Sequence, residues 1–319
     1  MRHLLGIEDI DRAQIERILE RAEGLAEVGR RDIKTVPTLR GRTVVNLFLE
    51  ASTRTLSSFE LAAKRLSADV VSVKAQGSSV EKGESLKDTV STLTAYDPAA
   101  IVIRSREAGA ARLVSNWTDA SVVNAGDGKH EHPSQALLDV FTIRRHLQTL
   151  EGKKIWIVGD IAHSRVARSC ALAFRKLGAE TTLCGPPTLI PPAIGEALDC
   201  EVTYEIDGLE DADVIYALRM QKERMTESLI PSLREYAERY QIDSRRLLPR
   251  QLLMHPGPVN RGVELSSDVI DSPQSLITEQ VESGLYVRMA ILYELLAGRN
   301  AGPEPKEPAS APSRIGQTA

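Results

Sequence analysis

The stretch Leu49-Glu50-Ala51-Ser52-Thr53-Arg54-Thr55-Leu56 joins an apolar run, residues 44–49, to a segment with helical spacing. The helix is indicated by apolar residues at mixed three- and four-residue spacing: Leu56, Phe59, Ala63 and Leu66. Ser52 is a candidate N-cap, and free backbone N–H groups at such a helix start favour an anion. Arg54 adds a guanidinium that matches two phosphate oxygens. The stretch predicts a phosphate site, the plainer alternative being a capped helix with a surface arginine.

A second strand-to-helix junction follows the apolar residues 122–123 and reads Gly126-Asp127-Gly128-Lys129-His130-Glu131-His132-Pro133-Ser134-Gln135. His132 could donate a hydrogen bond to a developing oxyanion, and the Gln135 amide could read an NH2 group on a small substrate. The two histidines and two acidic residues could also suggest a metal site. Their spacing, with no cysteine nearby, makes a weak ligand set, so we predict no metal here.

Short apolar runs alternate with longer amphipathic segments along the whole chain. The runs are residues 44–49, 70–73, 101–103, 122–123, 155–158, 181–183, 214–217 and 252–254. This alternation is typical of α/β folds with parallel sheets. At 319 residues the chain is long enough for two domains, each with its own core. We therefore expect two α/β domains, each a parallel sheet between layers of helices.

The domain boundary is expected just before the run at 155–158, which divides the chain into residues 1–148 and 149–297. The last helix, about 278–297, is predicted from its apolar positions, Val281, Leu285, Met289, Leu292 and Leu296. The tail, residues 298–319, is rich in Pro, Ala and Ser and cannot form a core, so we expect it to be disordered.

The run at 155–158 leads into Gly159-Asp160-Ile161-Ala162-His163-Ser164-Arg165. A dinucleotide-binding turn is the obvious alternative here, but it needs more glycines, so we expect no nucleotide cofactor. Arg165 is the informative residue, and Arg219 follows the run at 214–217 in the same way, with Gln221 beside it. Two arginines at the carboxyl ends of parallel strands face the crevice where such sheets bind ligands, and each can hold a carboxylate.

Composition excludes several classes of protein. The formal net charge of −4, without a basic cluster, argues against a nucleic-acid partner. No apolar stretch is long enough to span a bilayer, and acidic residues come too early at the N-terminus for a signal peptide. The three cysteines, Cys170, Cys184 and Cys200, lack metal-ligand spacing and are expected to be buried thiols. These features predict a cytoplasmic protein.

Several motifs in order resemble the transcarbamoylase family, and in particular its members that act on aspartate. They are Ser52-Thr53-Arg54-Thr55 with Ser58-Phe59-Glu60, then His132-Pro133-Ser134-Gln135, then His255-Pro256-Gly257-Pro258. The resemblance spans about residues 1–297. It implies two α/β domains, the first for carbamoyl phosphate and the second for aspartate, with the last helix crossing back to the first domain. The implied reaction gives N-carbamoyl-L-aspartate and phosphate in de novo pyrimidine biosynthesis, without a cofactor.

The resemblance also implies roles for single residues. Carbamoyl phosphate would be bound by Ser52, Thr53, Arg54, Thr55, Ser78, Lys82, Arg104, His132, Gln135, Pro256 and Gly257. Aspartate would be bound by Lys82, Arg165, Arg219 and Gln221. The catalytic residues would be Arg54, Thr55, Lys82, Arg104, His132 and Gln135. In the family a loop like residues 77–85, with Ser78 and Lys82, reaches into the neighbouring subunit, which implies a cyclic homotrimer with shared sites. A dihydroorotase or a regulatory chain is a possible further partner.

One position departs from the family pattern, in which an arginine usually follows the second Thr of the opening motif. Leu56 stands there and falls on the apolar stripe of the helix, so we expect packing in place of an ion pair. The alternative is an altered interface or weakened activity, as in a non-catalytic scaffold of a pyrimidine-pathway complex. Ornithine carbamoyltransferase is the nearest enzymatic alternative, but its pattern has cysteine where Pro256 follows His255.

Overall fold

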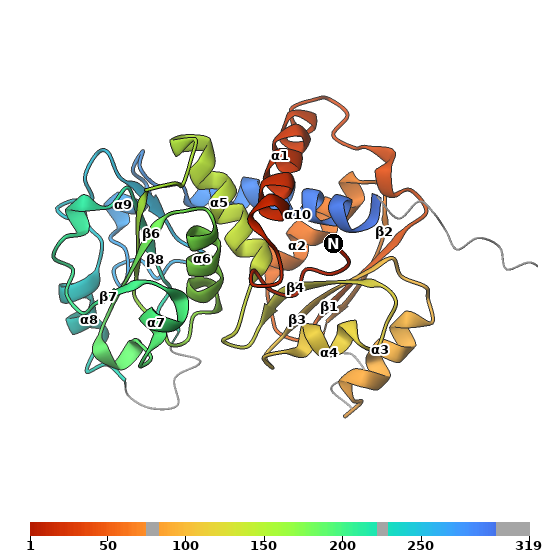
Figure 1. Ribbon diagram of the computed structural model, residues 1–319, viewed down its shortest axis with the longest axis horizontal. Helices are drawn as coiled ribbons and strands as arrows, with labels where there is room; N and C mark the ends of the chain where they lie inside the picture. Colours follow the sequence, from red (N-terminus) through yellow and green to blue (C-terminus); the bar gives the residue numbers. More distant parts are fainter. Residues whose placement is uncertain (75–82, 222–228, 298–319) are drawn as a thin grey trace, which may run out of the picture.

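The computed structural model describes residues 1–74, 83–221 and 229–297. It has two α/β domains side by side, each built on a parallel sheet (Figure 1). The first sheet has the order β2-β1-β3-β4, and its strands are β1 (Thr43–Phe48), β2 (Asp69–Lys74), β3 (Ala100–Ser105) and β4 (Ser121–Asp127). The second has the order β7-β6-β5-β8-β9, and its strands are β5 (Lys154–Val158), β6 (Glu180–Cys184), β7 (Glu201–Thr203), β8 (Val214–Ala217) and β9 (Leu252–Met254). The predicted fold class is confirmed.

Helices cover both faces of each sheet (Figure 1). Those of the first half are α1 (Arg12–Gly29), α2 (Thr53–Arg65), α3 (Leu86–Thr94), α4 (Ala110–Ser115) and α5 (Pro133–Leu147). Those of the second half are α6 (Arg165–Lys176), α7 (Ile194–Leu198), α8 (Leu233–Tyr240), α9 (Ser267–Ile270) and α10 (Ile277–Leu296). Short 3-10 turns lie at Pro37–Leu39, Pro187–Leu189 and Leu209–Asp211.

Alternating side chains of the strands pack on opposite faces, as parallel strands buried on both sides require. In β1, Val44 and Phe48 join the core beneath α1, α2 and α10, whereas Val45 and Leu47 join the core against α3 and α4. The first of these cores continues through α5 and α6 into the second domain. Leu56 is 7% exposed and belongs to it, which confirms that this residue packs into the protein.

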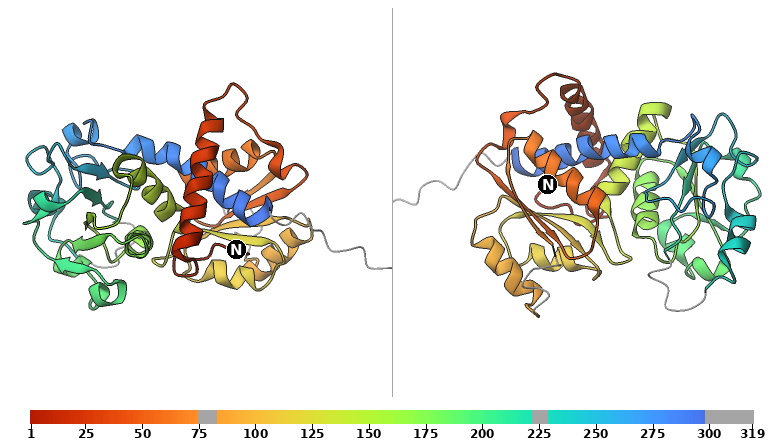
Figure 2. Two further views of the ribbon diagram at one scale, coloured as in Figure 1. Left: turned by 45° about the horizontal axis from the view of Figure 1, so that its top comes forward. Right: turned by 180° about the vertical axis from the view of Figure 1, so that it is seen from behind.

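Helix α10 joins the two domains. It begins beside β9, crosses α5 and packs against α1 and α2 of the first domain (Figures 1 and 2). The predicted crossing is therefore confirmed. Of the apolar positions that predict this helix, Met289, Leu292 and Leu296 are buried, whereas Leu285 is only partly buried and Val281 is 57% exposed. Val281 lines the cleft between the domains, so this part of α10 does not face the core.

The structure differs from the sequence-based expectations in three further details. Strand β7 is not predicted, because three residues at the edge of a sheet carry too little apolar periodicity. Ser52 occupies the N-cap position of α2, but its side chain makes no capping hydrogen bond. All three thiols are unpaired, and Cys200 is only partly buried, because the short edge strand that follows leaves it near the surface.

The tail, residues 298–319, lies outside the described residues. Within the described part of the chain, no helix combines the length and apolarity needed to cross a bilayer.

Leu292→Ala should test how strongly α10 ties the domains together. Leu292 is fully buried in the shared core, so the truncation leaves a cavity and should lower the free energy of unfolding by about 2–5 kcal/mol. Val281→Ala, on the exposed part of the same helix, should change it by less than about 0.5 kcal/mol. Urea denaturation of both variants provides the measurement, and equal effects would show that α10 is not anchored by this core.

Candidate active site

A cleft of about 1190 Å³ lies between the domains and is lined by residues from both. Every predicted site residue within the described chain lines it: Ser52, Thr53, Arg54, Thr55, Arg104, His132, Gln135, Arg165, Arg219, Gln221, Pro256 and Gly257. Ser78 and Lys82 lie outside the described residues. The structure thus brings twelve positions from six separate strand ends into one site.

The position of the cleft follows from the topology of the sheets. In the first sheet the strand order reverses between β1 and β3, and in the second between β5 and β8. Such switch points leave a crevice at the carboxyl ends of the strands, because the helices that follow leave on opposite faces. Arg54 follows β1 and Arg104 lies at the carboxyl end of β3, while Arg165 and Arg219 follow β5 and β8. The four arginines therefore lie at the two switch points.

The N-terminus of α2 forms one wall of the cleft. Thr53, Arg54 and Thr55 are its first helical residues, so their backbone N–H groups have no intrahelical acceptor. The helix dipole adds partial positive charge there, which suits a phosphate. Gly257 from the second domain approaches this wall with φ of +62°, and a Cβ at this position would lie 3.3 Å from the Arg54 Cζ. A small residue here allows the two domains to meet at Arg54.

Glu50 is a central site residue that sequence reasoning missed. Its carboxylate pairs with the Arg165 guanidinium, and the Arg104 Nε lies 3.2 Å from its Oε2. Arg104 also donates to the Ala125 carbonyl oxygen at 3.2 Å. One carboxylate thus connects arginines of both domains. The available signal was that Glu50 lies two residues before the hydroxyl-rich motif that begins at Ser52, but nothing local identified its partners.

His132, the N-cap residue of α5, is buried and neutral. Burial lowers its pKa well below the ordinary 6.5, and the positive charges of Arg104, Arg288 and Arg165 lower it further. Ser134 Oγ lies 3.4 Å from the His132 Nδ1. If the hydroxyl donates to Nδ1, the proton of the neutral ring is on Nε2. The His132 backbone N–H donates to Ser169 Oγ at 2.8 Å and fixes the loop. A neutral imidazole with one N–H is a donor suited to a carbonyl oxygen.

Arg288 on α10 is a second residue that sequence reasoning missed. It donates to Ser58 Oγ at 2.8 Å, and its Cζ lies 5.2 Å from the centroid of the Phe59 ring. Burial lowers its pKa to about 10, so it remains charged at neutral pH. The available signal was an arginine within the apolar run of residues 284–293.

The side chain of Gln135 is fixed by a buried carboxylate. Its Nε2 donates to the two carboxylate oxygens of Asp139 at 3.0 and 3.3 Å. Asp139 also accepts from Gln280 Nε2 at 2.7 Å, from the Tyr216 hydroxyl at 2.7 Å and from Cys170 Sγ at 3.4 Å. Complete burial nevertheless raises the pKa of Asp139 to about 6.

The second domain presents Gln221, Pro256 and Gly257 on two supported loops. Gln221 donates from its backbone to Asp160 Oδ2 at 3.2 Å and from Nε2 to the His163 carbonyl oxygen at 3.1 Å. In the loop after β9, the Gly257 N–H donates to His255 Nδ1 at 2.8 Å, and His255 Nε2 lies 3.2 Å from Glu264 Oε1. These contacts orient the backbone of Pro256 and Gly257 at the cleft.

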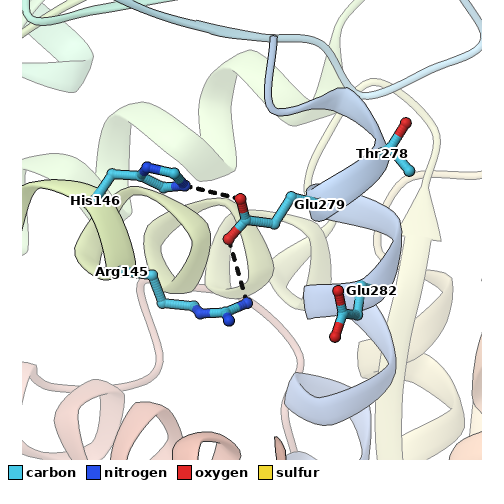
Figure 3. A pocket seen from close by; sticks show the side chains of 5 residues that line it. All are labelled: Arg145, His146, Thr278, Glu279 and Glu282. Atoms are coloured by element: carbon cyan, nitrogen blue, oxygen red, sulfur yellow. Dashed lines mark hydrogen bonds and ion pairs between the residues drawn. The ribbon is translucent and has the colours of Figure 1, made fainter. Parts of the chain in front are cut away.

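A second depression lies on the surface where α5 meets α10 (Figure 3). Glu279 bonds His146 Nε2 at 2.8 Å and lies 3.2 Å from Arg145 Nη1, so these charges satisfy one another across the two helices. We assign no substrate to it.

At the junction before α5, His130 pairs with Asp127 at 3.0 Å, and Glu131 accepts from Ile7 N at 2.8 Å. No group of three or more potential metal ligands occurs among the described residues.

Asp139→Asn should change how stability depends on pH. The folded-state pKa is raised from 3.8 to about 6, so the folded protein binds this proton more tightly than the unfolded chain does. The cost of the buried charge is therefore absent below about pH 4 and complete above about pH 6. Across this window the unfolding free energy of the unaltered protein should fall by about 3 kcal/mol relative to the variant. Urea denaturation at several pH values tests this, and parallel profiles would contradict it.

Comparison with known proteins places the chain in a family. Residues 2–145 match the carbamoyl-P binding domain of aspartate/ornithine carbamoyltransferases, and residues 151–295 match their Asp/Orn binding domain. The chain is 55% identical to the aspartate carbamoyltransferase catalytic subunit of Acidothermus cellulolyticus over 93% of each chain.

Solved structures agree with these matches. The catalytic subunit of M. jannaschii aspartate transcarbamoylase superposes with a TM-score of 0.84 at 36% identity, covering 95% of this chain and all of that one. Aspartate transcarbamoylase from Trypanosoma cruzi in complex with carbamoyl phosphate and aspartate superposes with a TM-score of 0.83 at 31% identity, covering 92% and 97%. The chain belongs to the aspartate/ornithine carbamoyltransferase family.

Proposed function

We propose that this protein is an aspartate carbamoyltransferase, which transfers the carbamoyl group of carbamoyl phosphate to L-aspartate. The observation that carries the proposal is the meeting, in one cleft, of a helix N-terminus, a neutral histidine and arginines from both domains. The close relative from Acidothermus cellulolyticus has this name, and the neighbour from Trypanosoma cruzi was solved with both substrates, which favours aspartate over ornithine. The product, N-carbamoyl-L-aspartate, would serve de novo pyrimidine biosynthesis.

The first domain, residues 1–148, would bind carbamoyl phosphate. The phosphate would lie against the first turn of α2, held by Ser52, Thr53, Arg54 and Thr55. Thr55, Arg104 and the Nε2 proton of His132 would donate to the carbonyl oxygen, and the Gln135 carbonyl oxygen would accept from the NH2 group. The backbone carbonyls of Pro256 and Gly257 would orient the carbamoyl and amino groups.

The second domain, residues 149–297 with α10 returning to the first domain, would bind aspartate through Arg165, Arg219 and Gln221. Because Arg165 now pairs with Glu50, an entering carboxylate would compete for this guanidinium. The uncharged amine of aspartate would attack the carbonyl carbon, and the negative charge would move to the oxygen. Collapse of this tetrahedral intermediate breaks the carbon–oxygen bond to phosphate, which leaves and accepts the amine's proton. Rate enhancement would come from juxtaposition and oxyanion stabilisation.

We also propose a cytoplasmic homotrimer in which Ser78 and Lys82 complete the active site of a neighbouring subunit. The support is the family resemblance of residues 77–85, and three thiols without a disulfide suit a reducing compartment. The net charge argues against a nucleic-acid partner, and nothing in the sequence suggests membrane attachment. A dihydroorotase or regulatory chain remains a candidate further partner.

Substrate choice is tested by phosphate release from carbamoyl phosphate with aspartate or with ornithine. Aspartate should be the better acceptor. Arg219→Ala should raise the KM for aspartate by a factor that corresponds to about 2–5 kcal/mol of binding free energy, because a charge partner is lost from a largely desolvated site. The KM for carbamoyl phosphate should change little.

Arg234→Ala is the matched control, since Arg234 is an exposed arginine of the same domain that pairs with Glu238 at 3.4 Å on α8. It should leave both KM values unchanged. Faster turnover with ornithine than with aspartate would contradict the proposed substrate. No turnover with either would favour a non-catalytic scaffold.

The shared site predicts complementation between inactive subunits. If Lys82 serves the neighbouring subunit and His132 its own, Lys82→Ala and His132→Ala trimers should each be nearly inactive. In a cyclic trimer that contains both kinds of chain, one site pairs an intact His132 with an intact Lys82. Random reassembly from equal amounts should therefore restore about a quarter of the unaltered activity.

The measurement is aspartate-dependent phosphate release after joint denaturation and refolding. Each variant refolded alone is the control. Mixed trimers that form but recover no activity would show that Lys82 and His132 do not act in sites shared between subunits.

A further inference from the structure

Asp139, near the middle of α5, lies deep behind the cleft and has no exposed surface. Its four hydrogen-bond partners come from four elements: Gln135 on α5, Cys170 on α6, Tyr216 on β8 and Gln280 on α10. Each of the four contributes a donor, so the carboxylate acts only as an acceptor. Such an arrangement requires an ionised or amide oxygen at this position, because an apolar side chain would leave four buried donors without a partner.

The orientation of the Gln135 amide follows from this carboxylate. An amide has a donor end and an acceptor end, and Asp139 takes the donor end at 3.0 Å. Reversing the amide would place its oxygen against the carboxylate oxygens, which is repulsive. The acceptor end, Oε1, is therefore the end that remains for a ligand in the cleft that Gln135 lines.

We propose that Asp139 is a positioning residue that gives the site its preference for an acyl phosphate bearing an NH2 group. By fixing Gln135 with its oxygen available, Asp139 makes the site accept a hydrogen bond from the ligand and disfavour a methyl group in the same place. The inference rests on the proposed function, because it assigns selectivity at the same site. A buried acceptor left without its donor disfavours the wrong ligand more strongly than the lost contact area alone.

A second contact adds to this role. Gln280 donates to Asp139 at 2.7 Å and accepts from the His255 backbone N–H at 3.0 Å. Asp139 thus links Gln135 to the loop that carries Pro256 and Gly257, whose carbonyls are proposed to orient the same carbamoyl group. Both parts of the carbamoyl pocket then share one support.

Acetyl phosphate is the probe, because it replaces the NH2 group of carbamoyl phosphate with a methyl group. We compare the KM for carbamoyl phosphate with the inhibition constant of acetyl phosphate in the full-length protein. Asp139→Leu should raise the KM for carbamoyl phosphate about tenfold or more, while the inhibition constant changes less than about twofold. Asp139→Ala serves the same purpose if the leucine variant does not fold. Asp139→Asn should keep most of the preference for carbamoyl phosphate over acetyl phosphate, since the asparagine oxygen can still accept from Gln135 and Gln280.

Two comparisons separate positioning from general damage. Tyr216→Phe removes a different donor from the same carboxylate, so it should leave the ratio of the two constants unchanged. In a Gln135→Ala background, the effect of Asp139→Leu or Asp139→Ala on the KM should largely disappear, because the residue acts through Gln135.

The inference would be overturned if the Asp139 variants bound carbamoyl phosphate and acetyl phosphate more weakly by the same factor. It would also be overturned if the effect on the KM persisted in the Gln135→Ala background. If the unaltered protein gives no aspartate-dependent turnover, the proposed function fails. Normal turnover with an unchanged ratio in the Asp139 variants would contradict the positioning role alone.

Discussion

The ion pairs of Glu50 are the interaction on which the cleft depends. Among the described residues, five arginines and two glutamates line it, so positive charge is in excess. Guanidinium groups in a partly desolvated space repel one another unless an anion lies between them. Glu50 supplies that anion for Arg104 and Arg165 and joins the two domains in doing so. A phosphate and two substrate carboxylates would meet the same electrostatic requirement.

Burial, together with the same positive charge, determines the state of His132. Burial lowers the pKa of the imidazole most, and the charges of Arg104, Arg165 and Arg288 lower it further, so the ring is held neutral. A neutral ring with its proton on Nε2 can donate to an oxygen that becomes negative during the reaction. The arginines would therefore act twice, first by attracting anionic ligands and then by keeping the histidine in the form that stabilises an oxyanion.

Sequence patterns identified the parts of the site that are local. Ser52 to Thr55, His132, Arg165 and Arg219 each follow an apolar run, and parallel strands bring such positions to one edge. Glu50, Arg288 and Asp139 were missed because their partners are distant along the chain. Glu50 and Arg165 are 115 residues apart, and Arg288 and Ser58 are 230 apart. Only the tertiary structure places these charges together. Strand β7 was missed for a different reason, because its three residues carry too little apolar periodicity.

Helix α10 shows how stability and the site are coupled. Met289 and Leu292 are buried in the core shared by the domains, whereas Gln280 and Arg288 carry polar atoms to the cleft. Both sets are fixed by one rigid helix, so a rotation that improved the packing of one set would misplace the other. A helix of this kind must satisfy apolar and polar neighbours at once, which explains why it has no simple apolar stripe. Arg288 lines the cleft and its neighbour Met289 lies in the core, so the mixed pattern follows from a helix that serves the core and the site within the same turns.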